Sequence, residues 1–339
     1  MSVAAVLSRR VFPRSATSAA WAVSLAAAGC WLVFIVYGLF IAARIYHPDS
    51  NIIFIWFNAY TFWVYLPVYG LLIAAGLLRR WILVIALAAV GMFHLAWVLP
   101  DYRPASAIPA EAREAPSFTL MTTNVFFGNE DYSGIAAEIL EEDPDVLFLQ
   151  EFGPRLKLEL ESAGVETRYP YRQTAYENQF FGNAVYSKFP LTEVGVLHAG
   201  NRPLIRATVR VGDTPVRLYN VHPTSPGFRE NIASDWNAGW RDITNILEAE
   251  EGALVIAGDF NMNQHHRWYR ELKDMGFESA HEERGRGNAT TWPTGRKLRP
   301  IRIDHVFHSG EVVTLSVREG RGEGSDHRPV IAELAVPGE

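Results

Sequence analysis

The first hundred residues contain three long apolar runs, and these constrain the fold more than any other feature of the chain. The runs cover about residues 21–43, 60–78 and 81–99. Each is close to the roughly 20 residues that a helix needs to cross a bilayer. Backbone N–H and C=O groups find no partner in lipid, so such runs are expected to be helical. Residues 1–100 are therefore predicted to be a membrane anchor with three transmembrane helices.

The charges around these runs predict how the anchor is oriented. Cytoplasmic loops of membrane proteins are enriched in Lys and Arg. Five of the six arginines in this region lie before the first run or in the tight turn between the second and third. The N-terminus and that turn are therefore predicted to be cytoplasmic, and everything after Pro100 to lie outside the cytoplasm, at the plasma membrane. The six arginines are Arg9, Arg10, Arg14, Arg44, Arg79 and Arg80.

Two other interpretations of the N-terminus involve cleavage. Residues 8–12 (SRRVF) resemble a twin-arginine export signal, and Gly29-Cys30 resembles a lipoprotein cleavage site. Export signals have short apolar cores, whereas here the apolar run continues well past Cys30. An uncleaved anchor is therefore favoured. Cys30 is the only cysteine of the chain, so thiol catalysis and cysteine-based zinc sites are excluded from the remainder.

The remainder of the chain reads as a linker followed by a soluble, acidic domain. Residues 101–116 are rich in Pro, Ala and charge and are predicted to be a linker. Residues 101–339 hold 25 Lys and Arg against 36 Asp and Glu, a net charge of −11. A domain this acidic is a poor electrostatic match for bulk nucleic acid. Nucleic acid therefore stays a possible partner that is not favoured, and no protein partner is inferred.

Residues 117–336 alternate strand-like and helix-like runs, which predicts an α/β domain with sheet-on-sheet packing and helices outside. The predicted helices are residues 134–142, 231–250 and 268–275. The predicted strands are residues 118–125, 146–150, 184–187, 205–211, 216–221, 253–257, 303–307, 312–317 and 330–334.

Polar residues occur where several of these strands begin or end. Strand ends meet at one rim of a packed sheet structure, and binding sites are commonly built there. We therefore expect these side chains to converge on one site. They are Asn124, Glu151, His222, Asp259, Asn261, Asp304, Asp326 and His327.

The motifs that contain these residues resemble the endonuclease/exonuclease/phosphatase superfamily, whose members have the DNase I-like fold. In chain order they are TTNV, LQE, GNAVYSK, NVH, GDFN, RIDHVF and GSDHRP, and the resemblance covers essentially residues 117–336. It implies a catalytic domain that is a four-layered α/β sandwich. The layout with three preceding spans is similar to that of bacterial members associated with teicoplanin and vancomycin resistance.

The resemblance also implies a metal site and substrate contacts. Glu151 would hold Mg²⁺ or Mn²⁺, with Asn124 and Asp326 beside it, because hard oxygen ligands suit these ions. Asn183 is predicted to contact substrate. Arg206 is predicted to neutralise an acidic residue of the site or to contact substrate, and a surface ion pair is the alternative for Arg206.

The resemblance implies five catalytic residues as well. Asp259 would orient the attacking water, and Asn261 would hydrogen-bond the phosphate. His327 would support the transition state, with Asp304 hydrogen-bonded to it. His222 would be a second histidine facing the phosphate.

These observations predict a divalent-metal-dependent phosphoesterase. The acidic domain, the short linker to the membrane and the absence of long insertions favour a lipid-linked substrate similar to undecaprenyl pyrophosphate. Three alternatives remain: a phospholipase C-like or sphingomyelinase-like phosphodiesterase, an extracytoplasmic nuclease, and a non-catalytic membrane protein that binds phospholipid.

Overall fold

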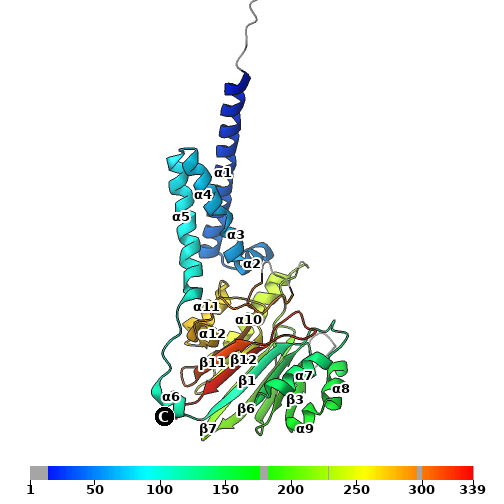
Figure 1. Cartoon of the computed structure of the whole chain (residues 1–339). Helices are drawn as coiled ribbons and strands as arrows, with labels where there is room; N and C mark the ends of the chain where they lie inside the picture. The colour runs from blue at the N-terminus through cyan, green and yellow to red at the C-terminus, as the bar shows by residue number, and fades with distance from the viewer. Residues whose placement is uncertain (1–13, 176–181, 228, 296–299, 339) are drawn as a thin grey trace, which may run out of the picture.

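A computed structural model describes residues 14–175, 182–227, 229–295 and 300–338 of the chain. Its N-terminal part is a group of apolar helices, in which α1 (Arg14–Tyr46), α4 (Pro67–Leu77) and α5 (Trp81–Val98) lie side by side and extend away from the rest of the molecule (Figure 1). Helices α1 and α5 each contain a segment long and apolar enough to cross a membrane. The predicted anchor is therefore supported by helix length and composition.

The second predicted span is less regular than the other two. It comprises α3 (Thr61–Tyr65) and α4, and α2 (Ile52–Ala59) precedes it at an angle of 82°. The described residues contain two candidate spans, or three if this bent pair is counted as one span. Helix α2 thus turns away from the bundle and lies at the junction with the second part of the molecule (Figure 1).

The second part contains two six-stranded sheets. The first has the order β11-β12-β1-β2-β4-β3, and the second has the order β5-β6-β7-β8-β10-β9. The strands are β1 (Ser117–Asn124), β2 (Val146–Gln150), β3 (Tyr171–Ala175), β4 (Asn183–Ser187), β5 (Thr192–Ala199), β6 (Arg202–Val211), β7 (Thr214–Val221), β8 (Leu254–Asp259), β9 (Glu278–Ser279), β10 (Asp304–His308), β11 (Val313–Glu319) and β12 (Val330–Ala335).

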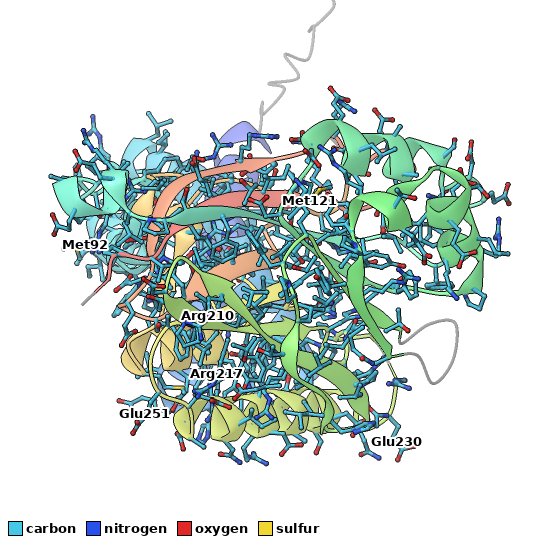
Figure 2. The ribbon with its side chains drawn as sticks, turned by 90° about the horizontal axis from the view of Figure 1, so that it is seen from below. Met92, Met121, Arg210, Arg217, Glu230 and Glu251 are labelled. Atoms are coloured by element: carbon cyan, nitrogen blue, oxygen red, sulfur yellow. The ribbon has the colours of Figure 1, made fainter. Side chains whose placement is uncertain are left out.

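The two sheets pack face to face, with helices on their outer sides (Figure 2). One buried cluster joins the sheets and includes Leu120 and Phe148 from the first and Leu218 and Val255 from the second. Helices α7 (Ser133–Glu142), α8 (Pro154–Ser162) and α9 (Val165–Arg168) cover the first sheet. Helices α10 (Ile232–Glu248) and α11 (Arg267–Asp274) cover the second, and α12 (Ala280–Glu283) lies beside β10 and β11. The predicted α/β fold with DNase I-like layers is confirmed.

The segment predicted as a linker, residues 101–116, lies against this domain. It follows the short 3₁₀-helix η1 (Leu99–Tyr102) and contains α6 (Ala110–Glu114). Asp101 is buried and accepts a hydrogen bond of 2.9 Å from Gln264, and the Ser106 N–H donates to the carbonyl of Glu283. Ala112 is fully buried. The anchor and the domain are therefore in contact through this segment as well as through α2.

Candidate active site

The topology brings the predicted strand-end residues to one edge of the two sheets. Strands β1 and β2 are parallel, with Asn124 paired to Gln150, so Asn124 and Glu151 end neighbouring strands. Strands β7 and β8 are also parallel, and His222 and Asp259 follow their last shared pair. Strand β10 runs the other way, and its first residue, Asp304, is paired with Asp259.

Gly258 permits the close approach of β7 and β8 just before Asp259. Its φ is +147°, and a Cβ atom there would lie 1.9 Å from the carbonyl oxygen of Val221. Only glycine fits this position without moving the backbone. The glycine of the GDFN motif therefore has a steric role in placing Asp259 beside His222.

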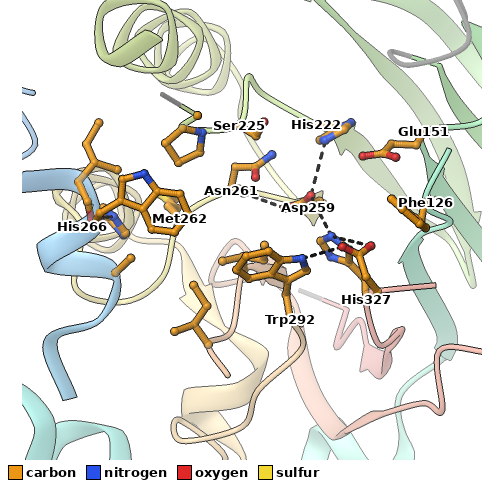
Figure 3. A pocket seen from close by; sticks show the side chains of 18 of the residues that line it. Phe126, Glu151, His222, Ser225, Asp259, Asn261, Met262, His266, Trp292 and His327 are labelled. Atoms are coloured by element: carbon orange, nitrogen blue, oxygen red, sulfur yellow. Dashed lines mark hydrogen bonds and ion pairs between the residues drawn. The ribbon is translucent and has the colours of Figure 1, made fainter. Parts of the chain in front are cut away.

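These residues surround one cavity of about 330 Å³ (Figure 3). A volume of roughly 300–1,000 Å³ is typical of small-molecule sites. His222, Glu151, Asp259 and His327 lie toward one side of it, whereas Met262 lies toward the blue ribbon of the anchor. The predicted residues that line it are Glu151, His222, Asp259, Asn261, Asp326 and His327. Asn124 and Asp304 do not line the cavity but hydrogen-bond to residues that do.

One hydrogen bond and one ion pair link the buried side chains of Asp304, His327 and Asp259. The His327 Nδ1 lies 2.9 Å from an Asp304 carboxylate oxygen, which fixes the ring so that Nε2 faces Asp259 at 3.8 Å. The His222 Nε2 lies 3.5 Å from the same Asp259 oxygen. All four side chains are buried. Asp259 therefore has an imidazole on either side.

Burial and neighbouring charges separate the proton affinities of the two histidines. Burial alone would lower the pKa of His327, but the carboxylates of Asp304 and Asp259 more than offset this and raise the pKa to about 10. Burial lowers the pKa of His222 to about 3, and the charges of Arg202 and His327 add to the lowering. At neutral pH His327 is therefore a cation and His222 is neutral.

Asp259 combines deep burial with strong hydrogen bonding. Burial raises the pKa of Asp259 to about 7, while the charge of His327 opposes the rise and that of Asp304 adds to it. Its two oxygens accept from the Asn261 backbone N–H at 2.9 Å and from the Asn124 Nδ2 at 3.0 Å. A carboxylate whose pKa lies near neutrality suits proton transfer at physiological pH.

Three cavity residues other than glycine have left-handed backbone conformations. Phe126 has φ +56°, Glu151 has φ +57° and Asn261 has φ +50°. Asparagine tolerates this region, but for glutamate it costs about 1–3 kcal/mol, and such strain is concentrated at functional sites. The turn directs the Glu151 carboxylate toward Asn124, whose Nδ2 donates at 3.1 Å, and toward the Phe127 N–H, which donates at 2.7 Å.

The predicted metal ligands fit a divalent cation by their donor chemistry. Burial raises the pKa of Glu151, and the like charge of Asp326 adds to the rise. A cation between the two carboxylates would relieve that repulsion, and oxygen donors of this kind suit Mg²⁺ or Mn²⁺. The Asn124 Oδ1 already accepts from the Phe126 N–H at 3.0 Å, and its Nδ2 bridges Glu151 and Asp259. Asn124 therefore also positions the carboxylates of Glu151 and Asp259.

Asp259, Asp304 and His327 form another group whose ligand atoms lie within 4.8 Å of one another. The His327 Nδ1 is already engaged with the Asp304 carboxylate at 2.9 Å. The positive charge that His327 holds also opposes a second cation between these groups. This triad is therefore less suited to hold a cation than the Glu151 side of the cavity is.

The structure does not bring Asn183 and Arg206 into the cavity lining. Asn183 is fully buried in β4, and its Nδ2 donates to the Pro203 carbonyl at 2.7 Å. Arg206 pairs with Glu250, whose carboxylate lies 3.6 Å away beyond the end of α10. The placement of Arg206 matches the ion pair weighed as the alternative, so substrate contact by these two residues is not supported.

Arg202, four residues before Arg206 on β6, is a functional candidate that the sequence reasoning missed. Strands rise about 3.3 Å per residue, so Arg202 lies about 13 Å nearer the active-site edge. Burial and the charge of Arg229 lower the pKa of Arg202 to about 10, and the charge of Glu151 opposes this. Arg202 does not line the cavity, but its charge acts on Glu151 and His222, as the charge of His327 also does. Both arginines lie in the run RPLIR, residues 202–206, and the sequence does not show which of them is nearer the site. The register of β6 in the sheet shows that it is Arg202.

Replacing Arg202 with alanine should lower kcat/KM about tenfold, because losing a positive charge close to the site should weaken anion binding by about 1.4 kcal/mol. Arg206→Ala is the matched control and should change kcat/KM less than about twofold, since exposed ion pairs contribute about 0–1 kcal/mol. Steady-state kinetics on one phosphoester substrate compare the two variants. Equal losses would contradict the assignment of Arg202.

Trp292 contacts two of the predicted site residues. Its Nε1 donates to the Asp326 carboxylate at 2.9 Å, and its ring lies beside the His327 ring with centroids 6.4 Å apart. Trp292 also lines the cavity. It therefore holds Asp326 in place at the mouth of the site.

Comparisons with known proteins agree with this fold. Residues 121–327 match the family model described as Endonuclease/Exonuclease/phosphatase family. A search of curated protein sequences finds no match.

Several solved structures share the fold at low sequence identity. One is an endonuclease/exonuclease/phosphatase from Beutenbergia cavernae, with 21% identity, a TM-score of 0.51, and coverage of 66% of this chain and 72% of that one. Another is humanized D. rerio TDP2, with 20% identity, a TM-score of 0.55, and coverage of 66% and 100%. D. rerio TDP2 complexed with single strand DNA product has 18% identity, a TM-score of 0.55, and coverage of 65% and 99%.

Proposed function

Since this chain belongs to the Endonuclease/Exonuclease/phosphatase family of phosphoester hydrolases, we propose that it is a divalent-metal-dependent enzyme that hydrolyses a lipid-linked phosphate ester or pyrophosphate at the outer face of the membrane. One observation carries the catalytic part of this proposal. Carboxylate, amide and imidazole groups from both sheets converge on a single cavity, and the charged His327 lies within 3.8 Å of Asp259.

The chain's own residues divide the reaction between them. Asp259 would accept hydrogen bonds from the attacking water and take up its proton, for which a raised pKa is suited. His327, held as a cation by Asp304, would stabilise the charge that develops on the phosphoryl oxygens. Neutral His222 and the Asn261 amide, both in the cavity lining, would hydrogen-bond the phosphate.

A divalent cation would be held by Glu151 and Asp326, with Asn124 beside them. When bound, it would polarise a phosphoryl oxygen and offset the negative charge that repels the nucleophile. Arg202 would add a fixed positive charge nearby.

The anchor supports the lipid-linked substrate and the outer location. The start of α1 and the connection between α4 and α5 lie at the end of the helix group away from the domain (Figure 1). This connection contains Arg79 and Arg80. Arginines mark the cytoplasmic side, so this arrangement is consistent with an extracytoplasmic domain. A membrane-bound enzyme meets lipid substrates at a raised effective concentration. A nuclease has less support, because the domain is acidic.

Purified full-length protein in phospholipid vesicles with Mg²⁺ should release phosphate from undecaprenyl pyrophosphate faster than it cleaves sphingomyelin or plasmid DNA. EDTA should abolish the release. Faster cleavage of DNA per phosphodiester would overturn the lipid assignment, and release that survives both EDTA and Asp259→Ala would overturn the metal-enzyme assignment.

A further inference from the structure

The connection between α1 and α3 lies on the catalytic domain. Asn51 begins α2 by accepting hydrogen bonds from the Ile53 and Phe54 N–H groups, which caps the helix. Helix α2 then lies beside α10 of the domain (Figure 1). In the sequence this segment is part of the predicted anchor, but in the structure it contacts the catalytic domain next to the candidate active site.

Asp49 fastens the start of this segment to the domain. Its fully buried carboxylate accepts from the Asn58 Nδ2 and from the backbone N–H of Arg267, the first residue of α11, both at 2.7 Å. The first N–H groups of a helix lack partners within it and favour a negative charge. The Asp49 carbonyl also accepts from the Asn237 Nδ2 at 3.0 Å.

His266 and Asn263, which follow the GDFN motif, hold the rest of α2 against the domain. The His266 Nε2 donates to the Ile55 carbonyl at 3.0 Å, while its Nδ1 accepts from the Asn263 N–H. The Asn263 Nδ2 donates to the carbonyl of Ala59, the last residue of α2, at 2.6 Å. The loop that presents Asp259 and Asn261 is thus tied directly to α2.

Apolar packing completes the contact. Ile55 is fully buried in the same cluster as Trp236, Phe260 and Met262. Ala59 packs against Ile301 and Ile303, which precede Asp304. Helix α2 is therefore held on its hydrogen-bonded side and on its apolar side by elements that also carry catalytic groups.

This arrangement makes α2 part of the cavity wall. Ile55, Trp56 and Ala59 line the same cavity as Asp259 and His327. Phe126, Phe127 and Trp292 also line it, and Phe127 is 45% exposed at its edge. The cavity therefore combines a charged end and an extended apolar surface, part of which the membrane anchor supplies.

We propose that this apolar surface binds a single long hydrocarbon chain esterified to the phosphate, including carbons beyond its first isoprene unit, and that Trp56 is its main specificity-determining residue. The inference rests on the proposed phosphoesterase function. The phosphate would lie between His327, His222 and the metal ligands, and the chain would extend along α2 toward the bilayer. A water-soluble phosphoester would leave the apolar wall in contact with water, so the wall favours substrates that bring their own hydrocarbon.

The test compares two allylic pyrophosphates whose prenyl chains differ in length. Full-length protein in detergent micelles would hydrolyse undecaprenyl pyrophosphate and the five-carbon dimethylallyl pyrophosphate, with phosphate release as the readout. Trp56→Ala should lower the ratio of the two kcat/KM values, long chain over short, at least tenfold. Phe127→Ala, a second variant at an exposed position, should lower the same ratio.

Ile53→Ala is the matched control, because Ile53 is on the same helix, is 62% exposed and does not line the cavity. It should leave the ratio unchanged. An unchanged ratio in both Trp56→Ala and Phe127→Ala would overturn the chain-binding wall while leaving the phosphoesterase intact. Wild-type protein that cleaves neither pyrophosphate but cleaves thymidine 5′-p-nitrophenyl phosphate, more slowly after Trp56→Ala, would instead assign the wall to a nucleobase. Inactivity of the wild type on all three substrates would count against the proposed function itself.

Discussion

Asp259→Asn should lower kcat by about 10²–10⁴-fold, the contribution typical of a general base. The substitution keeps the shape of the side chain but removes the oxygen that accepts from the Asn124 Nδ2 and faces both histidines. An amide there can neither take up a proton at neutral pH nor balance the charge of His327. Steady-state phosphate release at saturating Mg²⁺ measures the loss.

Asp274→Asn provides the matched control, since Asp274 is an exposed acid at the end of α11. It should leave kcat unchanged. The melting temperatures of both variants should stay well above the assay temperature, although the amide introduced at Asp259 faces another amide donor and costs about 1–3 kcal/mol. An Asp259→Asn enzyme with more than a tenth of wild-type kcat would exclude Asp259 as the base.

Glu151→Gln should raise the Mg²⁺ concentration needed for half-maximal activity by about 10²–10³-fold. Two unit charges about 4 Å apart interact by about 4 kcal/mol at an effective dielectric constant of about 20, and each 1.4 kcal/mol is about tenfold in affinity. The glutamine keeps the volume of the side chain but lacks the charge that, with Asp326, would attract the cation. Activity measured against Mg²⁺ concentration gives the shift.

A binding measurement separates this effect from a loss of catalysis. Mn²⁺ should raise the melting temperature of the wild type and of Glu311→Gln, an exposed control, but not that of Glu151→Gln. A cation bound only to the folded state stabilises it by mass action. Equal Mn²⁺ stabilisation of Glu151→Gln and the wild type would move the metal site away from Glu151.

The buried strands could be predicted from the sequence because the core imposes an apolar pattern on them. All nine predicted strands are present, including β2 and β8, whose residues are buried throughout. Strands β3 and β5 were missed because they are sheet edges, and most of their side chains are at least partly exposed. Strand β9 has only two residues and carries no pattern that can be recognised.

The catalytic positions were predictable for a related reason, since polar residues that interrupt apolar strands, such as His222 and Asp259, mark the strand ends. The docking of α2 was not predictable, because the apolar run around Ile55 and Trp56 also suits a membrane interface. Its attachment uses the carbonyl groups of Ile55 and Ala59, and backbone acceptors leave no signature in the residue types. The choice of Arg202 over Arg206 depended in the same way on register.

The attachment of Asp49 to α11 has a consequence for where the enzyme can work. A domain released from the bilayer by proteolysis, or made without its first hundred residues, would keep Asp259 and His327 but lack Ile55, Trp56 and Ala59. Such a fragment would be a less selective hydrolase with an open groove. With the long-chain substrate and the outer location proposed above, shedding would end processing of that substrate rather than spread it through the extracellular fluid. Confinement to the membrane would then be a property of the cavity itself.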